Sequence, residues 1–199
     1  MIDRTTLSTS DGVTLEARWD SVPDATAGVV FCHPHPKHDG TMMAPLMVAV
    51  TTRLNEHGLS LLRFNFRGTA KSGGTHEDGA GEMLDIDSAV AEVRREGLTV
   101  AMAGWSFGAA MAMRWLSARQ EKFPFAGIAP PADLLPDEPP PGPVRLILGR
   151  REQVIESDQL LEYASRHSLD VVLTSGDHFF HGRGKKIGDL VAQGLTTPS

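Results

Sequence analysis

Short apolar runs alternate with longer amphipathic runs along almost the whole chain. The short runs, some continuous and some alternating with polar residues, are predicted as strands: residues 5–7, 13–19, 28–32, 59–64, 98–103, 125–129, 144–148 and 170–173. The longer runs are predicted as helices: residues 45–56, 85–96, 109–116, 157–166 and 184–194. Strands joined by helices predict an α/β fold, with a mostly parallel sheet covered by helices on both faces.

Local signals refine this pattern at three places. The first two strands flank a turn at Asp11-Gly12, which predicts an antiparallel hairpin at one edge of the sheet. Residues 130–143 are rich in Pro, which lacks a backbone donor, so we expect a surface loop without regular structure. The alternation continues beyond this loop, so one domain is expected over residues 1–199. Ser157 is predicted to cap the helix that follows.

Composition narrows the class of protein. The chain has 199 residues with 41% hydrophobic residues, enough for a sizeable core. Its net charge of −6 argues against a nucleic-acid partner, which would require a basic face. Cys32 is the one cysteine and cannot form an internal disulfide. Neither a signal peptide nor an apolar run long enough for a membrane span is evident, so a cytoplasmic location is expected.

Residues 104–108 carry the most informative motif, Gly-Trp-Ser-Phe-Gly, which has the pattern G-x-S-x-G. It lies between a predicted strand and a predicted helix, the context of a nucleophile elbow. The turn in such an elbow is sharp, and the two glycines suit the close approach of strand and helix. Ser106 is therefore the candidate nucleophile, with its hydroxyl at the positive end of the following helix.

Four blocks in this order point to a family. They are H-P-H-P at residues 33–36, R-F-N-F-R-G at 63–68 with S-G at 72–73, G-W-S-F-G at 104–108 and G-D-H-F-F at 176–180. Through them the chain resembles the α/β-hydrolase superfamily, and most closely the small bacterial branch near the dienelactone hydrolases. The resemblance covers nearly the whole chain and implies an α/β-hydrolase fold without a lid domain, an open site and no cofactor.

The resemblance also implies a catalytic base and acid. The family order of Ser, acid and His requires a histidine after the last strand, where His178 matches the family block and His181 is the alternative. The acid follows the strand at 144–148, where the family has G-x-x-D. In this chain Glu152 stands at that Asp position, and the longer side chain is a departure from the family.

Other interpretations of the acid stay open. Arg150 and Arg151 flank Glu152 and would form an ordinary surface salt bridge with it if it has no catalytic role. Asp177 and Asp158 are then the remaining candidate acids.

An oxyanion hole requires two backbone N–H groups. By the family pattern, Phe107 supplies one of them, directly after the nucleophile. The other comes from the loop after Cys32, where Pro34 has no N–H, so His35 is the candidate. Further pocket candidates are His33, Trp105 and Arg67.

The function predicted is a serine hydrolase that cleaves small carboxylic esters through an acyl-enzyme intermediate, with lactones and thioesters left open. A small-molecule ester is the expected partner, without nucleic acid or membrane, and both monomer and dimer remain open. One alternative is a non-catalytic binding protein of the same fold. A second is a metal-dependent hydrolase that uses His33, His35 and His38, although Lys37 stands where the zinc motif has Asp.

Overall fold

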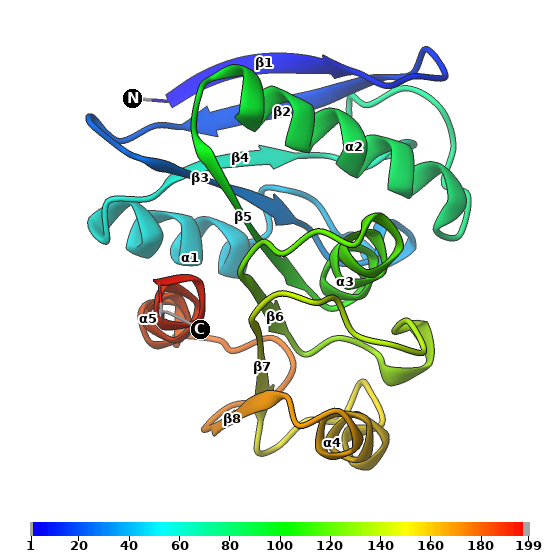
Figure 1. Ribbon diagram of the computed structural model, residues 1–199, viewed down its shortest axis with the longest axis vertical. Coiled ribbons are helices and arrows are strands. Elements are labelled where there is room, and N and C mark those ends of the chain that lie inside the picture. The colour runs from blue at the N-terminus through cyan, green and yellow to red at the C-terminus, as the bar shows by residue number, and fades with distance from the viewer. Residues whose placement is uncertain (1, 197–199) are drawn as a thin grey trace.

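The computed structural model describes residues 2–196, which form one eight-stranded sheet with helices on both faces (Figure 1). The strands are β1 (Ile2–Ser8), β2 (Thr14–Asp20), β3 (Ala27–Cys32), β4 (Ser60–Phe64), β5 (Thr99–Trp105), β6 (Phe125–Ile128), β7 (Val144–Gly149) and β8 (Asp170–Thr174). The helices are α1 (Pro45–Glu56), α2 (Ala80–Arg95), α3 (Phe107–Arg119), α4 (Ser157–Arg166) and α5 (Gly184–Thr196), with 3-10 turns η1 (Pro36–His38) and η2 (Ala132–Leu134).

The sheet order is β1-β2-β4-β3-β5-β6-β7-β8. The pairs β1–β2 and β2–β4 are antiparallel and every other pair is parallel, which confirms the mostly parallel sheet with a hairpin at one edge. Because the central strands β3 and β5 are covered on both faces, their sequences are continuous apolar runs. The carboxyl ends of β3, β5, β6, β7 and β8 therefore meet along one edge, where ligands bind in open α/β sheets.

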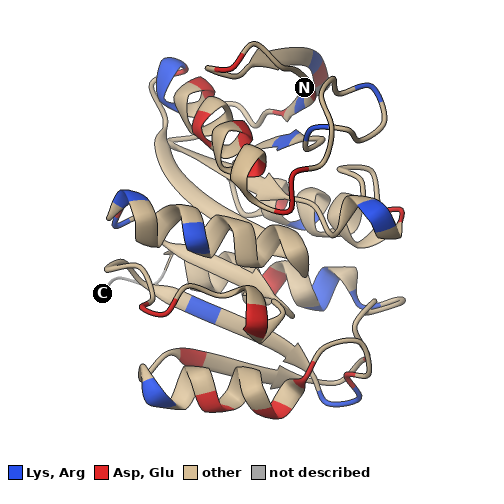
Figure 2. Ribbon diagram, turned by 90° about the vertical axis from the view of Figure 1, so that its right-hand side faces the viewer, with Lys and Arg blue, Asp and Glu red and all other residues tan. Residues whose placement is uncertain are grey.

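Two layers of helices enclose the sheet. Helices α1 and α5 pack against each other on one face, and α2, α3 and α4 lie on the other (Figure 1). Figure 2 shows acidic and basic residues interspersed along the helices. None of the helices in the described part of the chain is long and apolar enough to cross a membrane.

Helix α2 begins at Ala80, five residues before the expected start at Asp85. Gly79, with φ +116°, reverses the chain ahead of the helix, and its N–H donates to the Glu82 carboxylate at 2.8 Å. The cap thus adds a first turn that apolar periodicity does not reveal.

Two local expectations were wrong. Ser157 does not cap α4, because Glu156 occupies the cap position and the helix begins at Ser157 itself. The Pro-rich loop is not wholly irregular, since residues 132–134 form η2. Its bonds run from the N–H of Leu134 to Pro131 O and from the N–H of Leu135 to Ala132 O, so the turn needs no donor from a proline.

Candidate active site

Ser106 sits at the sharp turn between β5 and α3, at the carboxyl edge of the sheet. Its backbone angles are φ +53° and ψ −123°, a strained conformation for a residue with a side chain. Surrounding bonds hold it there: its N–H donates to Ile128 O at 2.8 Å, and its carbonyl accepts from Ala109 and Ala110. The side chain forms no hydrogen bond within residues 2–196, although Ser106 is only 8% exposed. The turn therefore holds Ser106 in a strained backbone conformation and leaves its hydroxyl without a hydrogen-bond partner.

The two glycines of the motif are required by close backbone approaches. A Cβ at Gly104 would lie 2.5 Å from Cα of Ala109 in the following helix. A Cβ at Gly108 would lie 2.3 Å from His33 O and 2.4 Å from Cys32 O. Glycine at these positions lets the first turn of α3 press against both β5 and the end of β3. The loop after β3 is thereby brought beside Ser106.

His178 and Glu152 form a buried pair on the neighbouring loops. Nδ1 of His178 lies 3.0 Å from Oε2 and 3.1 Å from Oε1 of Glu152, with side chains 5% and 1% exposed. A carboxylate accepts, so Nδ1 carries the proton and donates to it. Nε2 is then the unprotonated nitrogen of the neutral ring, the tautomer that a general base requires.

The loop of Glu152 itself holds the carboxylate. Oε1 accepts from the backbone N–H groups of Gln153 at 3.0 Å, Val154 at 2.8 Å and Ile155 at 3.3 Å. Burial raises the pKa of Glu152, but the hydrogen bonds from His178 and from the N–H of Val154 outweigh it, so the pKa lies below its usual value. The group is therefore ionised at neutral pH. The alternative, a surface salt bridge to Arg150 or Arg151, is not formed within the described residues.

Backbone contacts join the two loops that carry this pair. The N–H of Arg150 donates to Thr174 O at 2.8 Å, and the N–H of Arg151 donates to Gly176 O at 3.0 Å. A Cβ at Gly149 would lie 2.7 Å from Gly176 O, so the ends of β7 and β8 approach as closely as a glycine allows. Backbone contacts between the two loops thus fix the spacing of Glu152 and His178.

Trp105 links the elbow to the histidine loop. Its indole N–H donates to the backbone carbonyl of His178 at 3.2 Å, and the two ring centroids lie 6.0 Å apart. Trp105 itself is buried, with 5% of its surface exposed. The side chains of Ser106 and His178 form no hydrogen bond with each other. Trp105 nevertheless ties the residue before Ser106 to the main chain of His178.

A cavity of about 510 Å³ opens beside Ser106. It is lined by His35, His38, Ser106 and Phe107, and by residues 131–134, 154–156 and Gln159. The backbone N–H groups of His35 and Phe107 donate to no protein acceptor within residues 2–196. Two unpaired donors and one unpaired hydroxyl therefore belong to residues that line one cavity.

Comparisons with known proteins agree with this architecture. No family model matches the chain. It is 27% identical to an uncharacterized protein of Rickettsia prowazekii over 192 residues, 88% of this chain and 80% of that protein. An α/β serine hydrolase homologue from Coxiella burnetii shares 28% identity with a TM-score of 0.85, over 98% of this chain and 97% of that one. A protein from Xanthomonas campestris, described as an α/β serine hydrolase without lid, shares 25% with a TM-score of 0.86, over 100% and 97%.

Over residues 2–196, the chain has the fold of a small α/β-hydrolase without a lid. An esterase from Pyrococcus furiosus has the same fold, with 22% identity and a TM-score of 0.84 over 98% of this chain and 92% of that one. The relatives support a hydrolase activity in general.

His33 of this hydrolase is a buried structural residue. Its Nε2 accepts from the N–H of Phe66 at 2.9 Å, so Nδ1 carries the proton and donates to Pro34 O at 2.6 Å. Burial lowers its pKa to about 4. It does not line the cavity. Both ring nitrogens are occupied, so the interpretation of His33, His35 and His38 as metal ligands is wrong, and no group of three such residues is placed to hold a metal in the described chain.

Arg67 lies outside the lining of the cavity and holds three carboxylates. It is 1% exposed, and its guanidinium contacts Asp85, Asp11 and Glu77 at 2.9 to 3.0 Å. The N–H of Arg67 also donates to Asp85 at 2.8 Å. These contacts join the β1–β2 turn, the loop after β4 and helix α2, which is a structural role.

The alternatives to His178 and Glu152 have other partners. Asp177 Oδ1 accepts from the N–H groups of Phe179 and Phe180, both at 3.1 Å, and so shapes the loop of His178. His181 is exposed and stacks on Phe179, with ring centroids 5.7 Å apart. Asp158 is exposed on α4 and does not line the cavity.

Sequence reasoning missed most of the cavity wall. Residues 131–134 follow β6 and residues 154–156 follow β7, both at the carboxyl edge of the sheet. The position of loops after parallel strands is the one signal that could have indicated them.

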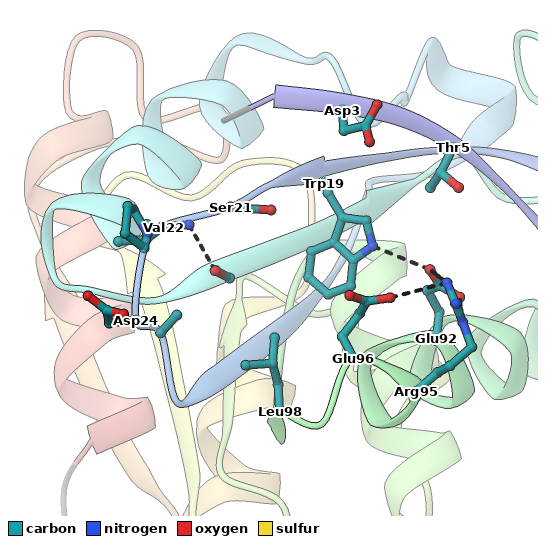
Figure 3. Close-up of a pocket in the computed structure, with 13 residues that line it drawn as sticks. Asp3, Thr5, Trp19, Ser21, Val22, Asp24, Glu92, Arg95, Glu96 and Leu98 are labelled. Atoms are coloured by element: carbon teal, nitrogen blue, oxygen red, sulfur yellow. Dashed lines mark hydrogen bonds and ion pairs between the residues drawn. The ribbon is translucent and has the colours of Figure 1, made fainter.

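A second cavity, of about 540 Å³, lies at the opposite edge of the sheet (Figure 3). It is lined by residues of β1, by Trp19 at the end of β2 and the segment 21–25 that follows, by Ser60 at the start of β4, and by the end of α2. Several of its polar groups bind one another: Trp19 donates to Glu92 at 3.4 Å, Arg95 contacts Glu92 at 2.7 Å, and Ser60 Oγ accepts from Val22 N–H at 2.9 Å. The cavity is similar in size to the one at Ser106, but these groups need no ligand.

Proposed function

We propose that this hydrolase cleaves small carboxylic esters through an acyl-enzyme intermediate. Ser106 is the nucleophile, His178 the general base and Glu152 the acid that orients it. The backbone N–H groups of Phe107 and His35 form the oxyanion hole. The observation that carries the proposal is the buried His178–Glu152 pair, in which the carboxylate orients the histidine through Nδ1 on a loop bonded to the strained elbow of Ser106.

In the first step, Oγ of Ser106 attacks the ester carbonyl carbon while Nε2 of His178 takes the hydroxyl proton. Negative charge gathers on the former carbonyl oxygen, where two N–H groups and the N-terminus of α3 stabilise it. The intermediate then collapses: the bond to the alcohol oxygen breaks and His178 returns the proton to that oxygen. The alcohol leaves, and the acyl group stays on Ser106.

In the second step, a water molecule attacks the acyl carbon and His178 takes its proton. The bond to Oγ breaks, the proton passes to Ser106 and the carboxylic acid is released. In both steps the ionised Glu152 stabilises the imidazolium, because its carboxylate accepts the Nδ1–H bond. Lactones and thioesters would react by the same sequence.

The test is the intact mass of the protein after exposure to a fluorophosphonate probe. We expect one adduct on the wild type and on Ser165→Ala, a control at an exposed serine of α4, and none on Ser106→Ala. In parallel, Ser106→Ala should lose nearly all hydrolysis of p-nitrophenyl butyrate. An adduct on folded Ser106→Ala, or unchanged hydrolysis by it, would contradict the proposal. No adduct on folded wild type would favour a binding protein.

A further inference from the structure

The cavity beside Ser106 carries two acidic side chains that have no partner. Asp133 lies on η2, and Glu156 stands just before α4. Neither forms an ion pair or a hydrogen bond through its side chain within residues 2–196. By contrast, the buried carboxylate of Asp20 is paired with Arg63 at 2.7 Å. The negative charges of Asp133 and Glu156, which no cation in the described chain neutralises, can therefore interact with a charged ligand in the cavity.

No cation among the lining residues offsets these carboxylates. The described lining contains no Lys or Arg. Lys37, next to His38 in sequence, pairs with Asp78 at 3.1 Å instead. Of the two imidazoles in the wall, His35 has a lowered pKa, first through burial and then through the nearby His76, so its ring is neutral at neutral pH.

The same cavity holds a polar group that points to a ligand independently of the acids. Ser106 is more than nine-tenths buried, its hydroxyl has no protein partner in the described chain, and it lines the cavity together with Asp133 and Glu156. A volume of about 510 Å³ is within the range of small-molecule sites. Asp133 and Glu156, which are both exposed to solvent, therefore line the space in which the reacting ester must lie.

We propose that Asp133 and Glu156 determine specificity, so that the hydrolase prefers esters whose cavity-bound group is positively charged to neutral esters of the same shape, and disfavours esters that carry a carboxylate. The inference rests on the proposed ester hydrolysis at Ser106. Two unit charges about 6 Å apart in a water-like dielectric change an equilibrium by about threefold. Replacing a cation by an anion reverses this effect for both carboxylates, so more than a tenfold preference is expected.

The substrates are p-nitrophenyl esters of matched shape: those of 4-(trimethylammonio)butanoic acid, its neutral isostere 5,5-dimethylhexanoic acid, and glutaric acid as the monoester. A second series carries the corresponding charges on the alcohol, because the cavity could accept either side of the ester. Each series is measured as kcat/KM with the wild type, the double variant Asp133→Asn/Glu156→Gln, and the control Glu162→Gln. Glu162 is an exposed carboxylate on α4 that does not line the cavity.

In at least one of the two series, the kcat/KM of the wild type should be more than tenfold higher for the cationic ester than for the anionic ester. The ratio should fall by more than tenfold in the double variant, because both carboxylates are removed, and stay unchanged in Glu162→Gln. Raising the salt from about 0.05 M to about 1 M should also reduce it, because the Debye length shortens to about 3 Å. Hydrolysis without charge preference in either series, or a preference that persists in the double variant, overturns the inference alone. Hydrolysis of none of the esters overturns the proposed function and the inference with it.

Discussion

Two cavities of similar size lie at opposite edges of the same sheet, about 510 Å³ beside Ser106 and about 540 Å³ beside Trp19. In the cavity of Figure 3, the indole N–H and both Glu92 oxygens bind neighbouring side chains. In the cavity at the carboxyl edge, the hydroxyl of Ser106 and two backbone N–H groups have no protein partner within residues 2–196.

The difference shows that volume does not distinguish a binding site from a structural recess. Buried polar groups are normally paired within the protein, so groups left unpaired at a strained residue indicate a ligand. Individual glycines also differ in packing. A Cβ on Gly104 or Gly108 of the elbow would overlap backbone atoms, whereas Gly97 before β5 has nothing within 4 Å of the place a Cβ would occupy.

The largest expected effect is a loss of activity that occurs at one of the two cavities and not at the other. Glu152→Gln should lower kcat by about 10³-fold or more, because an amide no longer stabilises the imidazolium or fixes the His178 tautomer. Glu92→Gln, the same change in the cavity of Figure 3, should leave kcat unchanged. Steady-state hydrolysis of p-nitrophenyl butyrate measures both. Equal losses in the two variants would mean that the carboxylates act through stability alone.

Packing at the elbow gives the next largest effect. Gly108→Ala should cost about 3 kcal/mol of unfolding free energy, because its Cβ would overlap two backbone carbonyls at the end of β3. Gly97→Ala should cost about 1 kcal/mol, since only its φ of +74° is unfavourable. Urea unfolding compares them. A Gly108 variant no less stable than the Gly97 variant would show that the elbow is not tightly packed.

Low pH should lower the free energy of unfolding, because His33 is buried at the carboxyl edge of the sheet with a lowered pKa. The unfolded side chain binds a proton near pH 6.5, whereas burial holds the folded pKa at about 4. Between these values the unfolded state binds more protons, so stability falls as the pH falls, by about 2 kcal/mol from pH 7 to 4.5. Urea unfolding across that range tests this, and His33→Gln should show a smaller dependence. An equal dependence in the variant would assign the effect to other groups.

The smallest effect belongs to the opposite edge. Trp19→Phe removes the indole donor to Glu92 and should cost about 1 kcal/mol of stability, with kcat unchanged. The urea midpoint and the hydrolysis rate measure the two parts. A fall in kcat with stability retained would show that this cavity is coupled to Ser106.

Much of the fold follows from the sequence because the buried strands β3 and β5 are continuous apolar runs and the helices between strands are long. The early start of α2 could not be predicted, since it depends on the φ of Gly79 and its bond to Glu82. The η2 turn was missed because none of its bonds needs an N–H donor from the prolines around it.

The candidate site was predictable to the extent that it follows strand ends. Ser106, Glu152 and His178 come after β5, β7 and β8, and parallel strands bring their carboxyl ends together. Asp133 and Glu156 also follow parallel strands, but that position alone does not show which residues of a loop line the cavity. The structural role of Arg67 was not predictable either, because its partners are distant in sequence.

In the loop after β7, the main chain and the side chains have separate roles. The backbone N–H groups of residues 153–155 hold the Glu152 carboxylate, while the side chains of residues 154–156 line the cavity. Substitution of those side chains leaves the N–H groups in place. The range of accepted molecules can therefore drift during evolution, or be altered by design, while the position of the acid is inherited unchanged.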